Sequence, residues 1–224
     1  MRVLDLFSGI GGFSLGLERA GMRTIAFCEK NEFCRAVLER HWPGIPIYDD
    51  IKTLNPGRGA ADVVCGGFPC QPFSTASRGR KVAEDLWPQM RRVIETVRPF
   101  WVVAENVDSI DDERPARELE KLDFRVWSLE VDAAPRGRRH ERRRALFVAH
   151  ANAHGEPRCA KYAQVAISQS CPGRGWWDQS APVGMDDGVP RRMDRMRALG
   201  NSVPPVVIEG IGRAIMATTE TESS

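Results

Sequence analysis

Residues 2–20, RVLDLFSGIGGFSLGLERA, begin with an apolar strand-like pattern, break at glycines and continue with helical spacing. The pattern predicts a strand over 2–7, a glycine turn, and a helix over 13–20 that ends at Gly21, because glycine tolerates the left-handed conformation after a helix. A strand, glycine turn and helix in this order are typical of the first unit of a doubly wound nucleotide-binding fold. In such units the glycines let a ligand approach the backbone where the helix begins.

Further strands and helices alternate along the chain. Apolar runs predict strands at 24–28, 45–48, 62–65, 99–104, 126–131 and 145–149. Helical spacing predicts helices at 32–41, 86–97 and 206–216, with a helix end at 119–124. The alternation predicts the α/β class: a Rossmann-like fold with a mainly parallel, twisted sheet that is covered on both faces.

Three of these strands lead to a carboxylate. Glu29 follows the second strand, Asp50 follows the third, and Glu105 follows the fifth. Ligands of open α/β sheets bind at the carboxyl ends of the strands, so we expect the three acids at one edge. Glu29 has the position from which such folds accept hydrogen bonds from ribose hydroxyls, although a solvated strand end explains that residue alone equally well.

The fourth strand leads into residues 66–74, GGFPCQPFS, in which Cys70 lies between two prolines. The glycines predict a sharp exit from the strand, and Pro69 and Pro72 restrict φ on either side of the thiol, so the loop is stiff at its root. We interpret Cys70 as a nucleophile; the alternative is a small apolar residue in a proline-rich turn. Residues 77–84 have the composition of a mobile surface loop that could act as a lid.

Residues 136–144, RGRRHERRR, place six arginines just before the seventh strand. The formal net charge of the chain is only +2, so this basic segment is a local feature. Arginine suits phosphate and planar acceptors, which favours contact with an anion over a solvated charged hairpin.

The 224-residue chain is long enough for one well-buried domain with a small appendage. It has no apolar run of membrane-spanning length, and its first residues enter a strand instead of a signal peptide, so we expect a cytoplasmic protein with no membrane partner. The six cysteines form no CxxC pair, which argues against a disulfide framework. No metal is expected, because the spacing of the histidines and cysteines after residue 149 fits no common zinc finger.

Taken together and in order, DLFSGIGG, Glu29, Asp50, GGFPCQPFS, ENV at 105–107, the arginine-rich segment and GNSVPP at 200–205 resemble the DNA cytosine-5 methyltransferases. The resemblance covers residues 1–150 and 191–216. It implies a Rossmann-like fold that uses S-adenosylmethionine, with a catalytic and cofactor-binding domain at 1–150 and a short irregular target-recognition region at 151–190. A C-terminal segment at 191–217 would return to the catalytic domain, before a disordered tail at 218–224.

The same resemblance implies roles for individual residues. The residues implied to bind S-adenosylmethionine are Phe7, Gly9, Gly11, Glu29, Asp50, Ile51, Pro69, Asn201 and Ser202. The catalytic residues would be Cys70 as the nucleophile, Glu105 as the acid at the base, and Arg142 and Arg144 beside the target ring. We also expect contacts with the nucleic acid from Gln71, Ser74 and Arg78, and from Arg174 and Trp176 of the short recognition region.

The implied reaction transfers a methyl group to carbon 5 of a cytosine flipped out of double-stranded DNA, through a covalent Cys70 adduct at carbon 6. A monomer is expected, with a cognate restriction endonuclease as a candidate partner. Three alternatives stay open: an RNA (tRNA) cytosine-5 methyltransferase of the same family, a catalytically weak DNA-binding relative, and a nicotinamide dehydrogenase. The spacing of FSGIGG, which is not GxGxxG, speaks against the last.

Three features depart from the family pattern. Lys30 stands where the family often has an aromatic residue that packs on adenine, which implies modest cofactor affinity. HERRR at 140–144 matches the family's arginine segment imperfectly, so the register of the catalytic arginine stays open. The recognition region is also short for the family.

Overall fold

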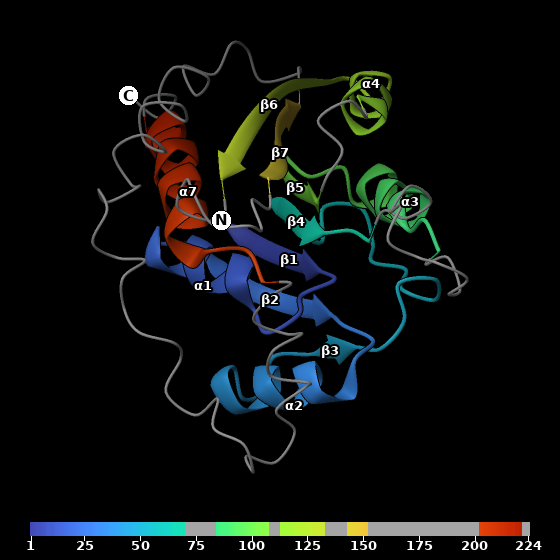
Figure 1. Cartoon of the computed structure of the whole chain (residues 1–224), viewed down its shortest axis with the longest axis vertical. Helices are drawn as coiled ribbons and strands as arrows, with labels where there is room; N and C mark the ends of the chain where they lie inside the picture. The colour runs from blue at the N-terminus through green and yellow to red at the C-terminus, as the bar shows by residue number, and fades with distance from the viewer. Residues whose placement is uncertain (70–83, 108–112, 133–142, 152–201, 221–224) are drawn as a thin grey trace.

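The computed structural model describes residues 1–69, 84–107, 113–132, 143–151 and 202–220. Within them lies a seven-stranded sheet of order β3-β2-β1-β4-β5-β7-β6 (Figure 1). The strands are β1 (Arg2–Leu6), β2 (Arg23–Cys28), β3 (Ile47–Tyr48), β4 (Val63–Gly67), β5 (Trp101–Val107), β6 (Phe124–Asp132) and β7 (Arg143–Ala151). The helices are α1 (Gly12–Arg19), α2 (Glu32–His41), α3 (Trp87–Val97), α4 (Arg114–Glu120) and α7 (Pro205–Glu220).

The pairing confirms an α/β fold with a mainly parallel sheet. β1 pairs in parallel with β2 and β4, and the pairs β2–β3 and β4–β5 are also parallel. β7 is the reversed strand of the described sheet, because it is antiparallel to both β5 and β6. A parallel return needs a crossover of a dozen or more residues, and fewer separate β6 from β7, so antiparallel pairing is the expected outcome.

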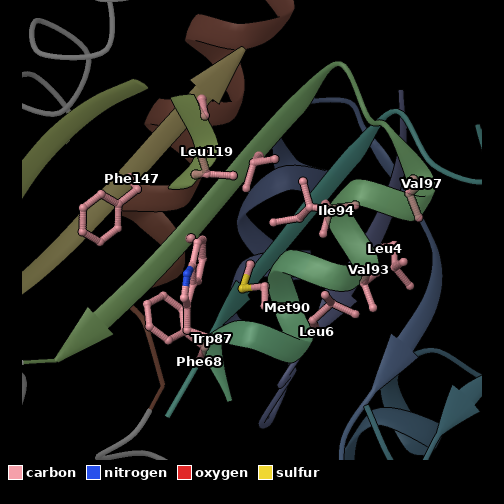
Figure 2. Packing of buried hydrophobic residues seen from close by; sticks show 14 of the residues in the cluster. Leu4, Leu6, Phe68, Trp87, Met90, Val93, Ile94, Val97, Leu119 and Phe147 are labelled. Carbon is pink, nitrogen blue, oxygen red and sulfur yellow. The ribbon is translucent and has the colours of Figure 1, made fainter. Parts of the chain in front are cut away.

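Helices cover the two faces of the sheet (Figure 1). On one face α3 contributes Trp87, Met90, Val93, Ile94 and Val97 to a buried cluster that also contains Leu119 of α4. Figure 2 shows these side chains meeting Leu4, Leu6 and Phe147 from the strands. On the other face α1 and α7 bury Phe13, Leu17, Ile208 and Ile211 against β1, β4, β5 and β7.

Glycines allow α7 to pack directly on α1. A Cβ atom added to Gly16 would lie 2.5 Å from the carbonyl oxygen of Pro205 and 2.7 Å from Cβ of Ile208. From the other side, a Cβ atom on Gly212 would lie 2.7 Å from Cβ of Ala20. The last described helix therefore lies against the first one at backbone distance.

Several boundaries differ from those expected from sequence. β4 continues through Gly66 and Gly67, so these glycines extend the strand instead of ending it; a Cβ atom on Gly66 would collide with the carbonyl oxygen of Leu6. β5 likewise extends through Glu105 to Val107. α4 ends at Glu120, and residue 124, expected at a helix end, begins β6. α7 runs to Glu220, so residues 218–220 are helical and not part of a disordered tail.

None of the described helices is long and apolar enough to cross a membrane. In the same residues, no group of three or more histidines, cysteines or acids is arranged to hold a metal ion. The irregular region expected at 151–190 lies almost entirely outside the described residues.

We predict that Gly16→Ala lowers the free energy of unfolding by about 1–3 kcal/mol, because the new methyl group must displace the backbone of α7. Alanine otherwise favours a helix interior over glycine by about 1 kcal/mol, so a loss of stability isolates the collision. Urea denaturation measures the effect. Gly57→Ala is the control, since a Cβ atom there meets no atom within 4 Å. An unchanged or higher stability of Gly16→Ala contradicts the packing of α7 on α1.

Candidate active site

The turn between β1 and α1 is built from residues with positive φ. Phe7, Gly9 and Gly11 have φ of 53°, 54° and 87°, and Gly11 directly precedes α1. A Cβ atom on Gly11 would lie 2.6 Å from the ring of Trp42, so this indole supports the turn from behind. At Gly9 an added Cβ atom would meet no atom within 4 Å. The turn is therefore braced on one side and open at Gly9.

The Glu29 carboxylate is fixed by two backbone amides at the end of β2. Its Oε2 accepts a hydrogen bond of 2.7 Å from the Gly9 N–H, and its Oε1 accepts one of 2.7 Å from the Asn31 N–H. A carboxylate has about four acceptor positions, so each oxygen can accept a second donor. The turn and the acid, predicted separately from sequence, thus form one unit.

Asp50 begins a tight turn after β3. Its Oδ1 accepts a hydrogen bond of 2.9 Å from the Lys52 N–H, and its carbonyl oxygen accepts from the amides of Thr53 and Leu54. The Ile51 side chain is only 4% exposed and belongs to the core cluster under α3. The turn is therefore anchored by an apolar side chain, while Asp50 stays partly exposed at the sheet edge.

Ser202 and Pro69 are two further described candidates near this edge. Ser202 precedes α7, and its Oγ would be 2.7 Å from a Cβ atom added to Gly12, at the start of α1. The carbonyl oxygen of Pro69 accepts a hydrogen bond of 3.3 Å from the Leu86 N–H, which joins the two ends of the segment 70–85.

Glu105 is a buried carboxyl on β5, with 4% of its surface exposed. It is in register with Gly67 of β4, and a Cβ atom added to Gly67 would lie 2.8 Å from Oε2 of Glu105. Any side chain at Gly67 would therefore displace the carboxylate. β4 ends at Gly67, three residues before Cys70 in the sequence, so Glu105 lies beside the strand that leads to the predicted nucleophile.

Eight predicted site residues lie outside the described residues: Cys70, Gln71, Ser74, Arg78, Arg142, Arg174, Trp176 and Asn201. The backbone of Arg144 is described, and it is in register with Val107 at the carboxyl end of β5. Because β7 is antiparallel, its arginine-bearing amino end lies at the same edge as Glu105.

Two of the buried thiols among the described residues are unsuited to nucleophilic attack. Burial, reinforced by Glu29, raises the pKa of Cys28 to about 12. Burial and the neighbouring Asp5 raise the pKa of Cys65 well above its ordinary value. The thiolate is the reactive form, so neither residue competes with Cys70 for this role.

Asp5 supports the glycine turn and was missed by sequence reasoning. It is fully buried, and its Oδ2 accepts hydrogen bonds from Ser14 N–H (3.2 Å) and Ser14 Oγ (2.7 Å). On the other side of the turn, Ser8 Oγ donates to the Asp5 carbonyl oxygen at 2.8 Å. Burial raises the pKa of Asp5 to about 7. The available signal was an acid placed between Leu4 and Leu6 in an apolar strand.

Comparisons with known proteins agree with this arrangement. Residues 1–169 match the family model of C-5 cytosine-specific DNA methylases. The chain is 37% identical over 114 residues to the type II methyltransferase M2.BsuMI of Bacillus subtilis (strain 168), covering 48% of this chain and 29% of that protein. It is 34% identical over 144 residues to the type II methyltransferase M.PspPI of Psychrobacter sp. (strain TA137), covering 58% of this chain and 34% of that protein. The chain thus spans about a third of the length of these curated relatives.

Solved structures give the same fold. A prophage-encoded protein of E. coli, assigned as a DNA modification methyltransferase, superposes with a TM-score of 0.53 and 27% identity, over 68% of this chain and 47% of that chain. The Entamoeba histolytica methyltransferase EhMeth superposes with a TM-score of 0.59 over 97% of this chain and 98% of that chain, and its 13% identity supports the fold alone. The Rossmann-like methyltransferase fold expected from the sequence is confirmed.

We predict that Asp5→Asn becomes more stable relative to the natural protein as the pH rises. A carboxyl pKa of about 7 in the folded state, against about 3.9 in the unfolded chain, means that the folded state binds the proton more tightly. Stability therefore falls as the pH rises from about 4 to about 7. Asparagine does not titrate and removes this loss. Measured by urea denaturation, the free energy of unfolding of Asp5→Asn should therefore rise by about 2 kcal/mol relative to that of the natural protein between pH ~5 and pH ~8.

Asp62→Asn is the control for this measurement. Arg2 lowers the pKa of Asp62 by hydrogen bonding, against the opposing effect of partial burial. The contribution of an acid with a lowered pKa is constant above its unfolded-state value, so Asp62→Asn should differ from the natural protein equally at both pH values. A pH-independent difference for Asp5→Asn as well would refute the buried, proton-binding Asp5.

Proposed function

The chain belongs to the C-5 cytosine-specific DNA methylase family, and we propose that it transfers a methyl group from S-adenosylmethionine to carbon 5 of cytosine in DNA. One observation carries the proposal. The buried Glu105 carboxyl lies against Gly67, on the strand that leads to Cys70, at the same sheet edge as the unit formed by Gly9 and Glu29. An acid and a nucleoside-type turn are thereby held at one edge of the sheet, and the candidate thiol follows β4 in the sequence.

The described residues fit S-adenosylmethionine. The open position at Gly9 allows a ligand to approach the backbone, and Glu29 offers fixed acceptors suited to the two ribose hydroxyls. Asp50 offers a partly exposed carboxylate suited to the adenine amino group. Phe7, Gly11, Ile51, Pro69, Asn201 and Ser202 complete the proposed set. When bound, S-adenosylmethionine supplies an electrophilic methyl group on a sulfonium.

Cys70 makes carbon 5 of cytosine reactive. Carbon 5 is a weak nucleophile, so the Cys70 thiolate first forms a bond to carbon 6, and the displaced π electrons make carbon 5 enamine-like. After carbon 5 has been methylated, a base removes its proton and the bond between sulfur and carbon 6 breaks. The electrons of the broken bond between carbon 5 and hydrogen restore the double bond between carbons 5 and 6, and those of the carbon–sulfur bond leave with the thiolate.

Glu105 is proposed to protonate the target ring at N3. Negative charge develops on the ring while Cys70 adds, a proton at N3 relieves it, and N3 returns this proton to Glu105 once the thiolate has left. Burial favours the neutral form of a carboxyl, which is the form that can donate. Arg142 and Arg144 are proposed to lie beside the ring, where cations would favour the thiolate and the developing charge.

The target base must leave the double helix, because neither face of carbon 6 is accessible to a thiol inside stacked DNA. Gln71, Ser74, Arg78, Arg174 and Trp176 are proposed to contact the nucleic acid around it. The type II names of the relatives support double-stranded DNA over tRNA as the substrate, and they motivate a cognate restriction endonuclease as a partner. A cytoplasmic monomer stays a prediction.

We predict that Cys70→Ala reduces transfer of tritiated methyl groups to DNA to background while binding of S-adenosylmethionine persists, because only the adduct at carbon 6 is lost. Cys34→Ala, which changes a buried cysteine of α2, should retain activity. DNA containing 5-fluorocytosine should form a denaturation-resistant complex with the natural protein and with Cys34→Ala, but not with Cys70→Ala. Methylation by Cys70→Ala would exclude the mechanism.

Parallel assays of the natural protein on DNA and on tRNA identify the substrate. We expect tritiated methyl groups in the DNA and none in the tRNA.

We also predict that Gly67→Ala lowers the rate of methyl transfer by about a hundredfold, because its methyl group displaces the Glu105 carboxylate. The contact is with the end of a side chain, so the melting temperature should change little. Gly57→Ala again serves as the control. Loss of folding in Gly67→Ala, or a rate within twofold of the natural protein, would contradict the positioning of Glu105 by Gly67.

A further inference from the structure

Arg92 joins α3 to the turn that begins at Asp50. Its Nη2 donates hydrogen bonds to two backbone carbonyl oxygens, of Ile51 at 2.7 Å and of Leu54 at 2.9 Å. Its Nε donates to Oε1 of Gln89 at 3.1 Å, which orients the guanidinium along α3. The residue is half-buried, so these bonds are partly shielded from water.

The turn needs such a donor because it resembles a helix that stops after one turn. The amides of Thr53 and Leu54 both donate to the carbonyl oxygen of Asp50, at 3.2 and 3.1 Å. The carbonyl groups at the end of a helical turn have no partners within it, and Pro56 disfavours helical geometry at Asn55, so the helix does not continue. Arg92 supplies the donors that a continuing helix would have supplied.

A second polar link from this turn to another part of the chain is weaker. Lys52 forms an ion pair with Glu84 at 2.8 Å, but the two side chains are 46% and 61% exposed. Exposed ion pairs of this kind contribute little. The side chains of Ile51 and Leu54 are both 4% exposed and hold the turn to the core. Ile51 and Leu54 fix only the buried side of the turn. The orientation of the turn's backbone, and therefore the position of Asp50, depends on Arg92.

We infer that Arg92 is a positioning residue that holds the Asp50 turn in the geometry required to bind the adenine end of S-adenosylmethionine. The inference rests on the proposed function, because it takes Asp50 as part of the cofactor site. Arg92 itself need not touch the cofactor. It acts through the two carbonyl groups whose orientation fixes the turn.

The test compares Arg92→Ala, Arg92→Lys and Arg91→Ala in the full chain. Arg91 is the matched control, since it is the next residue on α3 and its guanidinium faces Glu118, with Nε 3.8 Å from the carboxylate. Titration calorimetry gives the Kd for S-adenosylmethionine, and methylation assays give KM and kcat. Hydrogen–deuterium exchange of the peptide over 50–55 reports on the turn without any ligand.

We expect Arg92→Ala to raise the Kd and the KM for S-adenosylmethionine by about tenfold, with kcat at saturation within about twofold. Exchange over 50–55 should become at least about fivefold faster. Arg92→Lys, which keeps a donor, should recover part of both effects, and Arg91→Ala should show neither. Unchanged exchange in Arg92→Ala, or equal effects of Arg91→Ala, would overturn the inference. Failure of the natural protein to bind S-adenosylmethionine would refute the proposed function, while exchange still decides whether Arg92 holds the turn.

Discussion

The candidate site depends on close contacts at glycines, where a Cβ atom would not fit. Gly66 lets β4 lie against the Leu6 carbonyl group, and Gly67 leaves room for the Glu105 carboxylate. Gly12 and Gly16 let the segment from Ser202 to Glu209 lie on α1 at backbone distance. Close packing makes interiors intolerant of extra atoms, so these contacts fix relative positions more tightly than side chains that adapt. These contacts bring β4, β5, the glycine turn before α1 and the start of α7 to one edge of the sheet.

Carboxylates at this edge are held in two different ways. Glu29 is partly exposed and receives two backbone N–H groups, which satisfies a charged acceptor that must also meet a polar ligand. Asp5 is fully buried, and its pKa of about 7 records the cost of ionising a carboxyl away from water. The exposed acid is suited to binding, whereas the buried one is structural: its bonds to Ser14, with that of Ser8 to its carbonyl group, hold both sides of the glycine turn.

Local sequence patterns predicted the features that depend on neighbouring residues, such as helix bounds and the ends of strands. The bounds of α2 were correct because its amphipathic spacing begins after Asn31, whose side chain caps the helix, and ends before Pro43. Glu29 and Glu105 were predicted at one edge because parallel strands align their carboxyl ends. The role of Gly67 was not visible, since consecutive glycines equally indicate a turn. Arg92 was missed because its acceptors lie about forty residues away and leave no local pattern.

The spacing of apolar residues also could not predict the direction of β7. That direction decides at which edge of the sheet the arginine-rich segment before β7 lies. A parallel β7 would have placed its amino end, and the arginine-rich segment before it, at the edge opposite to Glu105. The observed antiparallel pairing puts the Arg144 backbone beside Val107, two residues beyond Glu105. A role for Arg144 next to the target base is thus compatible with the sheet only because β7 is reversed. The short connection from β6, which forbids a crossover, therefore brings the basic segment to the edge where the acid lies.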